Sequence, residues 1–311
     1  MKFLHYLLPA TFSLLIATNV GSQDLNLDLK AKATDKISGV KDSYINSYTN
    51  KFTGEITNSI ASFVENSFES NKYLDFSINA QEYLKPTFSI MSVNEIMKID
   101  SGTIFNQTSI NTHDGDETIN LGFGIRKLLN NNTLLLGANT FYDHQLTESH
   151  ERVGMGAEAI TSIFDLRGNY YNAISGSKNT TEGSERALDG WDTQIDYHLP
   201  GEHDVNFFTN AFKFENPDKI STYEEKGNKY GANAKLGHFL MEAGYMDDNQ
   251  GGDSYFGSIK FVVNIGEQKE NKTRNFLEYT DVSDKLYQPV KRENKIRVVK
   301  ISASNVEVGG F

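Results

Sequence analysis

The feature that most constrains the fold of this chain is an alternation of apolar and polar residues with a period of two. Within residues 191–199, large apolar side chains such as Trp191 and Ile195 alternate with polar or charged ones. This period indicates a β-strand with two unlike faces. Similar segments recur from about Lys72 to Ile265, between turns that alternate in length. The pattern is typical of a transmembrane β-barrel, in which apolar residues face lipid and polar residues face the lumen.

The alternation predicts twelve strands, each close to the ~9–11 residues that a tilted strand needs to cross a bilayer. The predicted strands are 72–81, 86–96, 102–112, 119–129, 133–144, 151–161, 164–174, 190–200, 205–215, 229–237, 239–248 and 254–265. We therefore expect an all-β fold, a 12-stranded antiparallel transmembrane β-barrel over residues 71–266.

The predicted connections alternate between long and short. Residues 175–186 and 216–228 are long and polar. The intervening connections are short, namely 130–132, 162–163, 201–204 and 238. Because outer-membrane barrels have long extracellular loops and short periplasmic turns, the long connections are expected at the cell surface. An even number of strands then returns the chain to the periplasm near Gly266.

The same alternation assigns the two faces of the strands. Toward lipid we place Leu121, Phe123, Ile125, Leu134, Leu136, Tyr142, Val153, Met155, Ala157, Trp191, Ile195, Tyr197, Leu199, Tyr230, Ala232, Leu236, Tyr255, Ile259, Phe261, Val263 and Ile265. A Lys or Arg on that face would cost about 2–4 kcal/mol at mid-depth. The charged residues of the strands are therefore expected to face the lumen.

The lumen is predicted to carry a ladder of opposite charges. Its members are Arg126, Asp143, Arg152, Glu158, Asp165, Arg167, Asp192 and Asp196, with Lys229, Lys235, Glu242 and Lys260 further round the wall. Six are positive and six negative, which favours cross-strand ion pairs over an ion filter of one sign. We expect these pairs to be partly hydrated, each contributing only ~0.2–1 kcal/mol.

Composition excludes several other classes of function. The chain has no Cys, so disulfides, metal thiolates and cysteine nucleophiles are absent. Its net charge of −11 argues against nucleic acid as a partner. Asp143 and His144, with Glu148, His150 and Glu151 nearby, have the generic spacing of a solvated polar loop rather than a metal or acid/base site. We predict no enzymatic activity, no metal and no cofactor.

The N-terminus predicts export from the cytoplasm. Residues 1–22 combine an early lysine, a short apolar run and small residues, as in a signal peptide, so the mature chain should begin at Gln23. Residues 23–70 show apolar residues every four positions and predict a periplasmic amphipathic helical segment. This segment caps the mouth of the barrel or, alternatively, serves as an arm for self-association into a homo-oligomer or for peptidoglycan attachment.

Several motifs in the strands resemble a known family. They are Asn120-Leu121-Gly122-Phe123-Gly124-Ile125-Arg126, Leu136-Gly137-Ala138-Asn139-Thr140-Phe141-Tyr142-Asp143, Arg152-Val153-Gly154-Met155-Gly156-Ala157-Glu158, Asn169-Tyr170-Tyr171, Glu185-Arg186-Ala187, Gly190-Trp191-Asp192 and Leu199-Pro200. In this order they are similar to the β-domain of the intimin and invasin inverse autotransporters, strongly over 119–200 and more weakly over 56–300. The resemblance implies a barrel in the outer membrane of a Gram-negative bacterium that carries a passenger outward through its own lumen. Its partners would be outer-membrane lipid, the barrel-assembly machinery and periplasmic chaperones.

Residues 267–311 are expected to form a linker that threads the pore. Residues 286–300 are similar to the family's linker, which occupies the pore as a helix and then as an extended strand. The candidate pore residues are Lys291, Arg292, Asn294, Ile296 and Arg297. The stretch is strongly basic and could pair with lumen carboxylates, although a disordered basic tail remains an alternative. Pro289 interrupts any helix that runs through it.

Only residues 301–311 follow the stretch 286–300 that is similar to the family's linker, where intimin-like relatives carry immunoglobulin-like and lectin-like domains that bind host receptors. We therefore expect no adhesin passenger on this chain, and no host receptor can be assigned. Two classes of function stay open. One is an anchor and translocator of the inverse-autotransporter type, and the other is a stand-alone porin-like or structural barrel.

Overall fold

The computed structural model describes residues 71–82, 84–180, 183–201, 204–218, 222–250, 254–264, 278–302 and 307–310. The predicted signal peptide and the predicted amphipathic helical segment lie outside these residues. So do residues 265–277, at the start of the predicted linker region.

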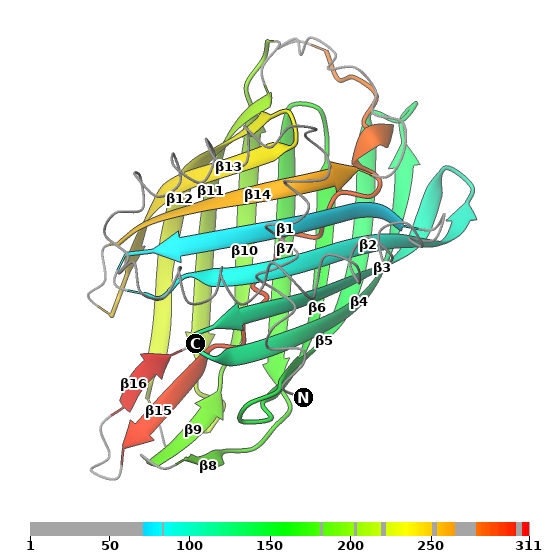
Figure 1. Cartoon of the computed structure of the whole chain (residues 1–311). Coiled ribbons are helices and arrows are strands. Elements are labelled where there is room, and N and C mark those ends of the chain that lie inside the picture. Colours follow the sequence, from blue (N-terminus) through cyan, green and yellow to red (C-terminus); the bar gives the residue numbers. More distant parts are fainter. Residues whose placement is uncertain are drawn as a thin grey trace, which may run out of the picture. The chain divides into compact units, whose positions relative to one another are not determined.

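Twelve antiparallel strands of the described chain close into a barrel (Figure 1). They are β1 (Asn71–Gln81), β2 (Thr87–Ile99), β3 (Gly102–His113), β4 (Asp116–Leu129), β5 (Leu134–Gln145), β6 (Glu151–Ile160), β7 (Phe164–Ala173), β10 (Asp189–His198), β11 (Asp204–Glu215), β12 (Glu224–Leu236), β13 (Phe239–Asp248) and β14 (Ser254–Asn264). The barrel is closed by β1 against β14, from Tyr73 opposite Asn264 to Gln81 opposite Phe256. The predicted all-β barrel of twelve strands is confirmed.

Two strands begin three or more residues earlier than predicted. β4 starts at Asp116 because Asp114 and Gly115 make a two-residue turn, in which both residues have positive φ (52° and 94°). Such turns match the twist of a hairpin and favour Asp-Gly. β12 starts at Glu224, opposite Glu215, so the β11–β12 hairpin extends into the connection predicted as a loop.

A second sheet of four short strands lies beyond one end of the barrel (Figure 1). It consists of β8 (Lys178–Thr180), β9 (Gly183–Ala187), β15 (Val298–Ser302) and β16 (Glu307–Gly310), in the order β16-β15-β9-β8. Residues 175–186 were predicted to form a loop. That assignment was wrong, because β9 is formed by pairing with a segment from the far end of the chain, which local alternation does not reveal.

The two ends of the barrel differ in their connections. The long-loop rim carries the connections 174–188 and 216–223, and the short-turn rim carries the turns 100–101, 130–133, 161–163 and 237–238. The four-stranded sheet grows from the long-loop rim, because β8 and β9 lie within residues 174–188.

Apolar side chains cover the outer face of the barrel. Exposed large residues that were predicted to face lipid are Leu121, Phe123, Ile125, Leu136, Tyr142, Met155, Trp191, Ile195, Tyr197, Tyr230, Leu236, Tyr255 and Ile259. Phe261 differs, since its ring is buried and packs against the rings of His238 and Phe239. Among the described residues no helix has the length and apolar character needed to cross a membrane.

Glycines on the inner face make room for aromatic rings from neighbouring strands. A Cβ atom at Gly122 would lie 2.2 Å from the ring of Phe141, and one at Gly124 would lie 2.4 Å from the ring of Phe105. The rings therefore lie flat on the wall, because the glycines opposite them carry no side chain. This arrangement leaves space in the lumen for a further segment of chain.

Candidate functional site: the lumen and its linker

The linker, here residues 278–302, runs from the short-turn rim to the long-loop rim. At the short-turn rim, the Val282 N–H donates to the carbonyl oxygen of Asn132 at 2.9 Å. At the long-loop rim, β15 pairs with β9 from Val298 opposite Ala187 onward. Figure 1 shows the segment in orange to red. Between its two ends the linker is held by side chains that face the lumen.

The linker contains a single turn of 3₁₀-helix, Ser283–Lys285, and is not helical elsewhere in its described residues. The helix implied by the family resemblance is therefore not formed here. Pro289 lacks the backbone donor that a helix would need, and beyond it the chain is irregular, with bends at Arg292 and Lys295, until β15 begins at Val298.

Arg126 on β4 holds the linker just inside the short-turn rim. Its Nη1 donates to the carbonyl oxygens of Leu286 at 2.8 Å and of Gln288 at 2.6 Å. Its Nε donates to Oε1 of Glu158 on β6 at 2.6 Å, and its guanidinium lies 4.5 Å from the centre of the Phe105 ring. Arg126 is fully buried. A charge at this depth requires the partners that the carboxylate and the carbonyls provide.

Asp143 on β5 is the centre of a second group of contacts. Arg292 of the linker donates through both terminal nitrogens to both carboxylate oxygens, at 2.8 and 2.7 Å. Arg152 on β6 donates to the same carboxylate at 2.9 Å and to the carbonyl oxygen of Glu293 at 2.6 Å. The Arg292 guanidinium lies 4.2 Å from the centre of the Phe141 ring. Because bidentate pairs of arginine and carboxylate are strong and directional, this group both orients the linker and holds it.

Asp165 on β7 and Asp196 on β10 share a third arginine. Arg167 donates to Asp196 Oδ2 at 2.6 Å and to Asp165 Oδ2 at 2.9 Å. The linker adds one lysine to each carboxylate: Lys285 Nζ lies 3.2 Å from Asp165, and Lys291 Nζ lies 2.7 Å from Asp196. Each aspartate is therefore shared between an arginine of the wall and a lysine of the linker.

Neutral amides bind the linker backbone directly. Asn120 on β4 donates to the carbonyl oxygen of Asn294 at 2.9 Å, and Asn169 on β7 donates to that of Lys291 at 3.0 Å. Asn120 also donates to Asp143 at 2.7 Å. These amides therefore connect the linker backbone to the charged side chains of the wall.

Asp192 on β10 acts on the linker through its neighbours. It accepts hydrogen bonds from the Tyr171 hydroxyl and from Asn169 Nδ2, the latter at 2.9 Å. The Tyr171 hydroxyl in turn accepts the N–H of Glu293 at 2.7 Å. Asp192 thus orients two side chains that contact the linker.

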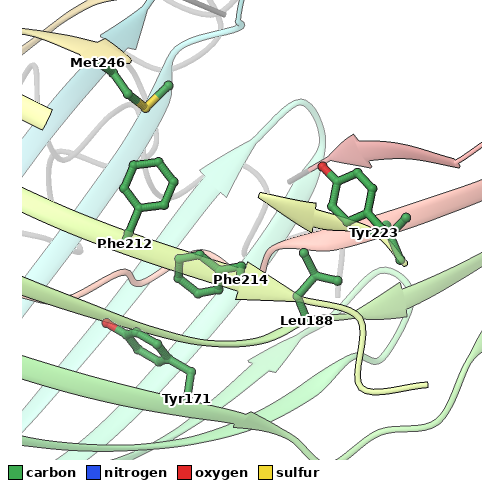
Figure 2. Close-up of a cluster of buried hydrophobic side chains, with 7 residues drawn as sticks. Tyr171, Leu188, Phe212, Phe214, Tyr223 and Met246 are labelled. Carbon is green, nitrogen blue, oxygen red and sulfur yellow. The ribbon is translucent and has the colours of Figure 1, made fainter. Parts of the chain in front are cut away.

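The linker leaves the barrel through an apolar cluster at the long-loop rim (Figure 2). The cluster consists of Tyr171, Leu188, Phe212, Phe214, Tyr223, Met246 and Val299. Ile296 and Val298 pack beside it against Ala173 and Ala187. Ile296, Val298 and Val299 of the linker are all buried here, so side chains pack closely around the linker where it leaves the barrel.

Charged groups of the linker flank this apolar exit. Arg297 pairs with Glu225 on β12 and lies 3.1 Å from Glu293. Lys300 lies 3.1 Å from Glu185 on β9. The imidazole of His150 lies 3.6 Å from the same Glu185. Burial lowers the pKa of His150 below its ordinary value, and the Glu185 carboxylate offsets this only in part.

The opposite wall of the barrel leaves a space beside the linker. A cavity of about 310 Å³ separates linker residues 289–297 from the inner face of strands that include β1, β2 and β11–β14. Its lining includes the predicted inward charges Lys229, Glu242 and Lys260. The linker is therefore held mainly against β4–β7 and β10.

The ion pairs of the lumen differ from the partly hydrated ladder that the sequence analysis expected. The side chains of Arg126 and Glu158 are 0% and 2% exposed, and those of Arg152 and Asp143 are both 0% exposed. The expectation was wrong because it treated the lumen as an open, water-filled channel, whereas the linker and the aromatic rings exclude water from this wall. Removing one partner of a buried pair is far more costly than removing one of an exposed pair.

All eight residues of the predicted ladder lie buried on the inner face. Those that contact the linker directly are Arg126, Asp143, Arg152, Asp165 and Asp196, and those that act through neighbours are Glu158, Arg167 and Asp192. Of the predicted linker residues, Lys291 and Arg292 pair with wall carboxylates and Asn294 accepts from Asn120. Ile296 packs in the exit and Arg297 reaches Glu225.

The sequence analysis missed the neutral residues of the site, together with two acids. These are Gln107, Asn120, Asn169, Tyr171, Glu225 and Glu293. Gln107, Asn120, Asn169 and Tyr171 lie at inward positions of the same period of two that located the charges, but they carry no charge. Glu225 lies in the stretch that was predicted to be a loop, and Glu293 lies among the basic residues of the linker.

The polar residues near Asp143 separate into two different pairs. His144 lies 3.7 Å from Glu151, while His150 lies beside Glu185 instead. Within the described residues no group of three His, Cys, Asp or Glu side chains is arranged to hold a metal ion.

Comparison with known proteins identifies related chains. Residues 16–294 match the family described as "Inverse autotransporter, beta-domain". The "Putative attaching and effacing protein homolog" of Escherichia coli (strain K12) is 37% identical over 100 residues, which are 31% of this chain and 34% of that protein. The "Invasin" of Yersinia enterocolitica is 33% identical over 103 residues, 32% of this chain and 12% of that protein. The match thus spans about a third or less of the length of these relatives.

A solved structure from a study of the in-meso crystallization of membrane proteins has the same fold. It superposes with a TM-score of 0.62 at 21% identity, covering 73% of this chain and 98% of the other. The shared feature is the architecture of the barrel.

Proposed function

Because the chain belongs to the inverse autotransporter β-domain family, whose members are non-enzymatic outer-membrane barrels, we propose that it anchors and exports a C-terminal segment. In this proposal the lumen holds the linker in one fixed register after export, and whatever follows β15 is displayed at the cell surface. The long-loop rim is the extracellular one.

The observation that carries this proposal is the bidentate pair between Arg292 and Asp143. It lies between the Asn132 contact at one rim and the β9–β15 pairing at the other. Contacts with side chains of the wall continue from Lys285 to Lys300. A segment that merely folded back into the barrel would not need to pass from one rim to the other.

The runner-up is a stand-alone porin-like or structural barrel. The observation that favours it is the cavity beside the linker, since a polar space in the lumen is also what a permeation path requires. The two functions differ in where the C-terminus lies and in whether the linker closes the pore.

The test combines two measurements on one chain. An epitope tag after Phe311 should be reached by antibody on intact cells. Deletion of residues 281–311 should raise the single-channel conductance in planar bilayers, because it empties the lumen. A tag that is detected only after permeabilisation, with unchanged conductance on deletion, would favour the stand-alone barrel.

A control separates loss of export from loss of folding. The deleted chain should still migrate as a heat-modifiable folded barrel in electrophoresis, since the twelve strands pair without the linker. A tag placed in the connection 216–223 should be reached in both versions, which reports the orientation of the barrel independently of the linker.

A further inference from the structure

The cavity beside the linker ends at an apolar layer. The layer is seen on three neighbouring strands, β14, β1 and β2. On each of them, inward-facing residues nearer the long-loop rim line the cavity, and the next one toward the short-turn rim does not. On β1 the cavity is lined by Asn79, Ser77 and Asp75, on β2 by Thr87, Ser89 and Met91, and on β14 by Ser258 and Lys260. The next inward residue on each strand is Tyr73, Val93 or Val262, and none of these three lines the cavity.

These three residues belong to one packed cluster that reaches from the wall to the linker. Its members are Tyr73, Val93, Phe105, Phe141, Val262 and Val290, with Leu240 and Tyr287 packed against it. Five of the six come from the wall, and Val290 comes from the linker. Tyr73 lies directly opposite Val93, so the layer is continuous between β1 and β2. Leu240 both lines the cavity and contacts the cluster, which places the layer at the end of the cavity.

Beside this layer, the lumen over β4–β6 is filled by Arg126 and Glu158. The Arg126 guanidinium lies over the ring of Phe105 and bonds to Glu158 and to two carbonyls of the linker. Arg126 and Glu158 are both buried. The ion pair therefore borders the apolar layer at Phe105 and contacts the linker beside it.

We propose that the apolar layer in which Val290 of the linker packs with Tyr73, Val93, Phe105, Phe141 and Val262 is the permeability seal of the barrel. An apolar constriction blocks ions by excluding water, because nothing in it can replace the hydration shell. The polar cavity beyond it has the hydrogen-bonding groups that hold water and so does not resist permeation. In this proposal the charge ladder positions the linker, and the apolar layer excludes water and ions.

The backbone of Val290 is fixed independently of its side chain. Its N–H donates to Oε1 of Gln107 at 2.7 Å, and its carbonyl oxygen accepts from Nε2 of the same side chain at 3.4 Å. Gln107 is fully buried. A substitution of the valine side chain therefore leaves these two bonds, and with them the position of the linker, in place.

The test is Val290→Ser in the full chain, measured as single-channel conductance in planar bilayers. The expected result is a conductance above that of the wild type, because a hydroxyl and a smaller volume admit water to the layer. Val299→Ser is the matched control. It is the same substitution at an equally buried valine of the linker, but in the exit cluster, and its conductance should stay at the wild-type value.

A wall variant covers the case in which Val290→Ser does not fold. Val93→Ser removes an apolar side chain from the same layer without changing the linker, and it should also raise conductance in a barrel that remains heat-modifiable. Wild-type conductance in a folded variant of the layer would overturn the proposal. So would an equal rise in Val299→Ser, because leakage would then not depend on this layer.

The inference rests on the linker lying in the pore, as in the proposed function, but not on export. An epitope tag after Phe311 that is inaccessible on intact cells would count against export alone. A Val290→Ser chain that displays the tag and conducts no better than wild type would count against the seal alone.

Discussion

The two walls of the lumen carry similar sets of charged side chains but place them in different surroundings. The clamp wall, β4–β7 with β10, holds its charges buried and shares them with the linker, as Asp143 does with Arg292 and Arg152. The open wall, β11–β14 with β1, leaves Glu242 and Lys260 along a cavity. The difference shows that the contribution of a charged side chain to stability is not fixed by its position in the lumen alone. Its role depends on whether a second segment of chain excludes water from it.

The largest expected contrast between the walls concerns the loss of one carboxylate charge. Glu158→Gln should lower the free energy of unfolding by about 3–5 kcal/mol, since it leaves the buried Arg126 without its counter-ion. Glu242→Gln is the matched control on the open wall and should change stability far less. Denaturant titration of the folded barrel, followed by heat-modifiable migration, measures both. Equal effects would mean that the two walls are hydrated alike.

The two faces of a single strand, β10, should respond differently to an added positive charge. Ile195 on β10 is 48% exposed, and Ile195→Lys should destabilise the barrel by up to about 2–4 kcal/mol, because it places a charge on the lipid-facing side of the wall. Gln194→Lys, one residue away and facing the lumen beside Asp196, should assemble normally. Comparison of the folded fractions of the two variants in outer membranes tests this. Tolerance of both would indicate that the register of β10 is wrong.

A smaller effect should distinguish geometry from charge within the clamp wall. Arg292→Lys keeps the positive charge but loses the second of two hydrogen bonds to Asp143, a loss of about 1.5 kcal/mol. Lys291→Arg should be nearly neutral, since the single bond from Lys291 to Asp196 can be made by a guanidinium. Both are read from the midpoint of denaturation. A stable Arg292→Lys barrel would show that Asp143 needs only a charge.

The alternation of side chains was sufficient to predict the barrel wall. It located all twelve strands and placed residues such as Arg126 and Asp196 on the inner face, where the structure has them. It was not sufficient for the ends of strands. The Asp114-Gly115 turn lets β4 begin three residues earlier, at Asp116 rather than Ile119, a choice made by turn geometry rather than by hydrophobicity.

The sequence predicted many of the residues that form the candidate site, but not their partners or their burial. Arg292 and Asp143 were both identifiable as charged residues at particular faces, yet nothing local pairs residues separated by 149 positions. Neutral groups such as Gln107 and Asn120 were recoverable from the inner-face pattern but carried no distinguishing charge. The apolar seal was not recoverable at all, because Val93 and Val262 in the lumen break the rule that inward residues are polar.

The sequence by itself determined the strands, their two faces and the antiparallel order, because these depend on residues that are adjacent in the chain or joined by short connections. Only the tertiary structure decided how the lumen is filled. It set the linker against the clamp wall, buried the ion pairs, paired β15 with β9 and left a cavity opposite. The physical reason is that a side chain becomes buried only when surfaces from distant parts of the chain come together in the folded protein. A charge or a valine acquires its energetic role only when the partner that excludes water from it is in place.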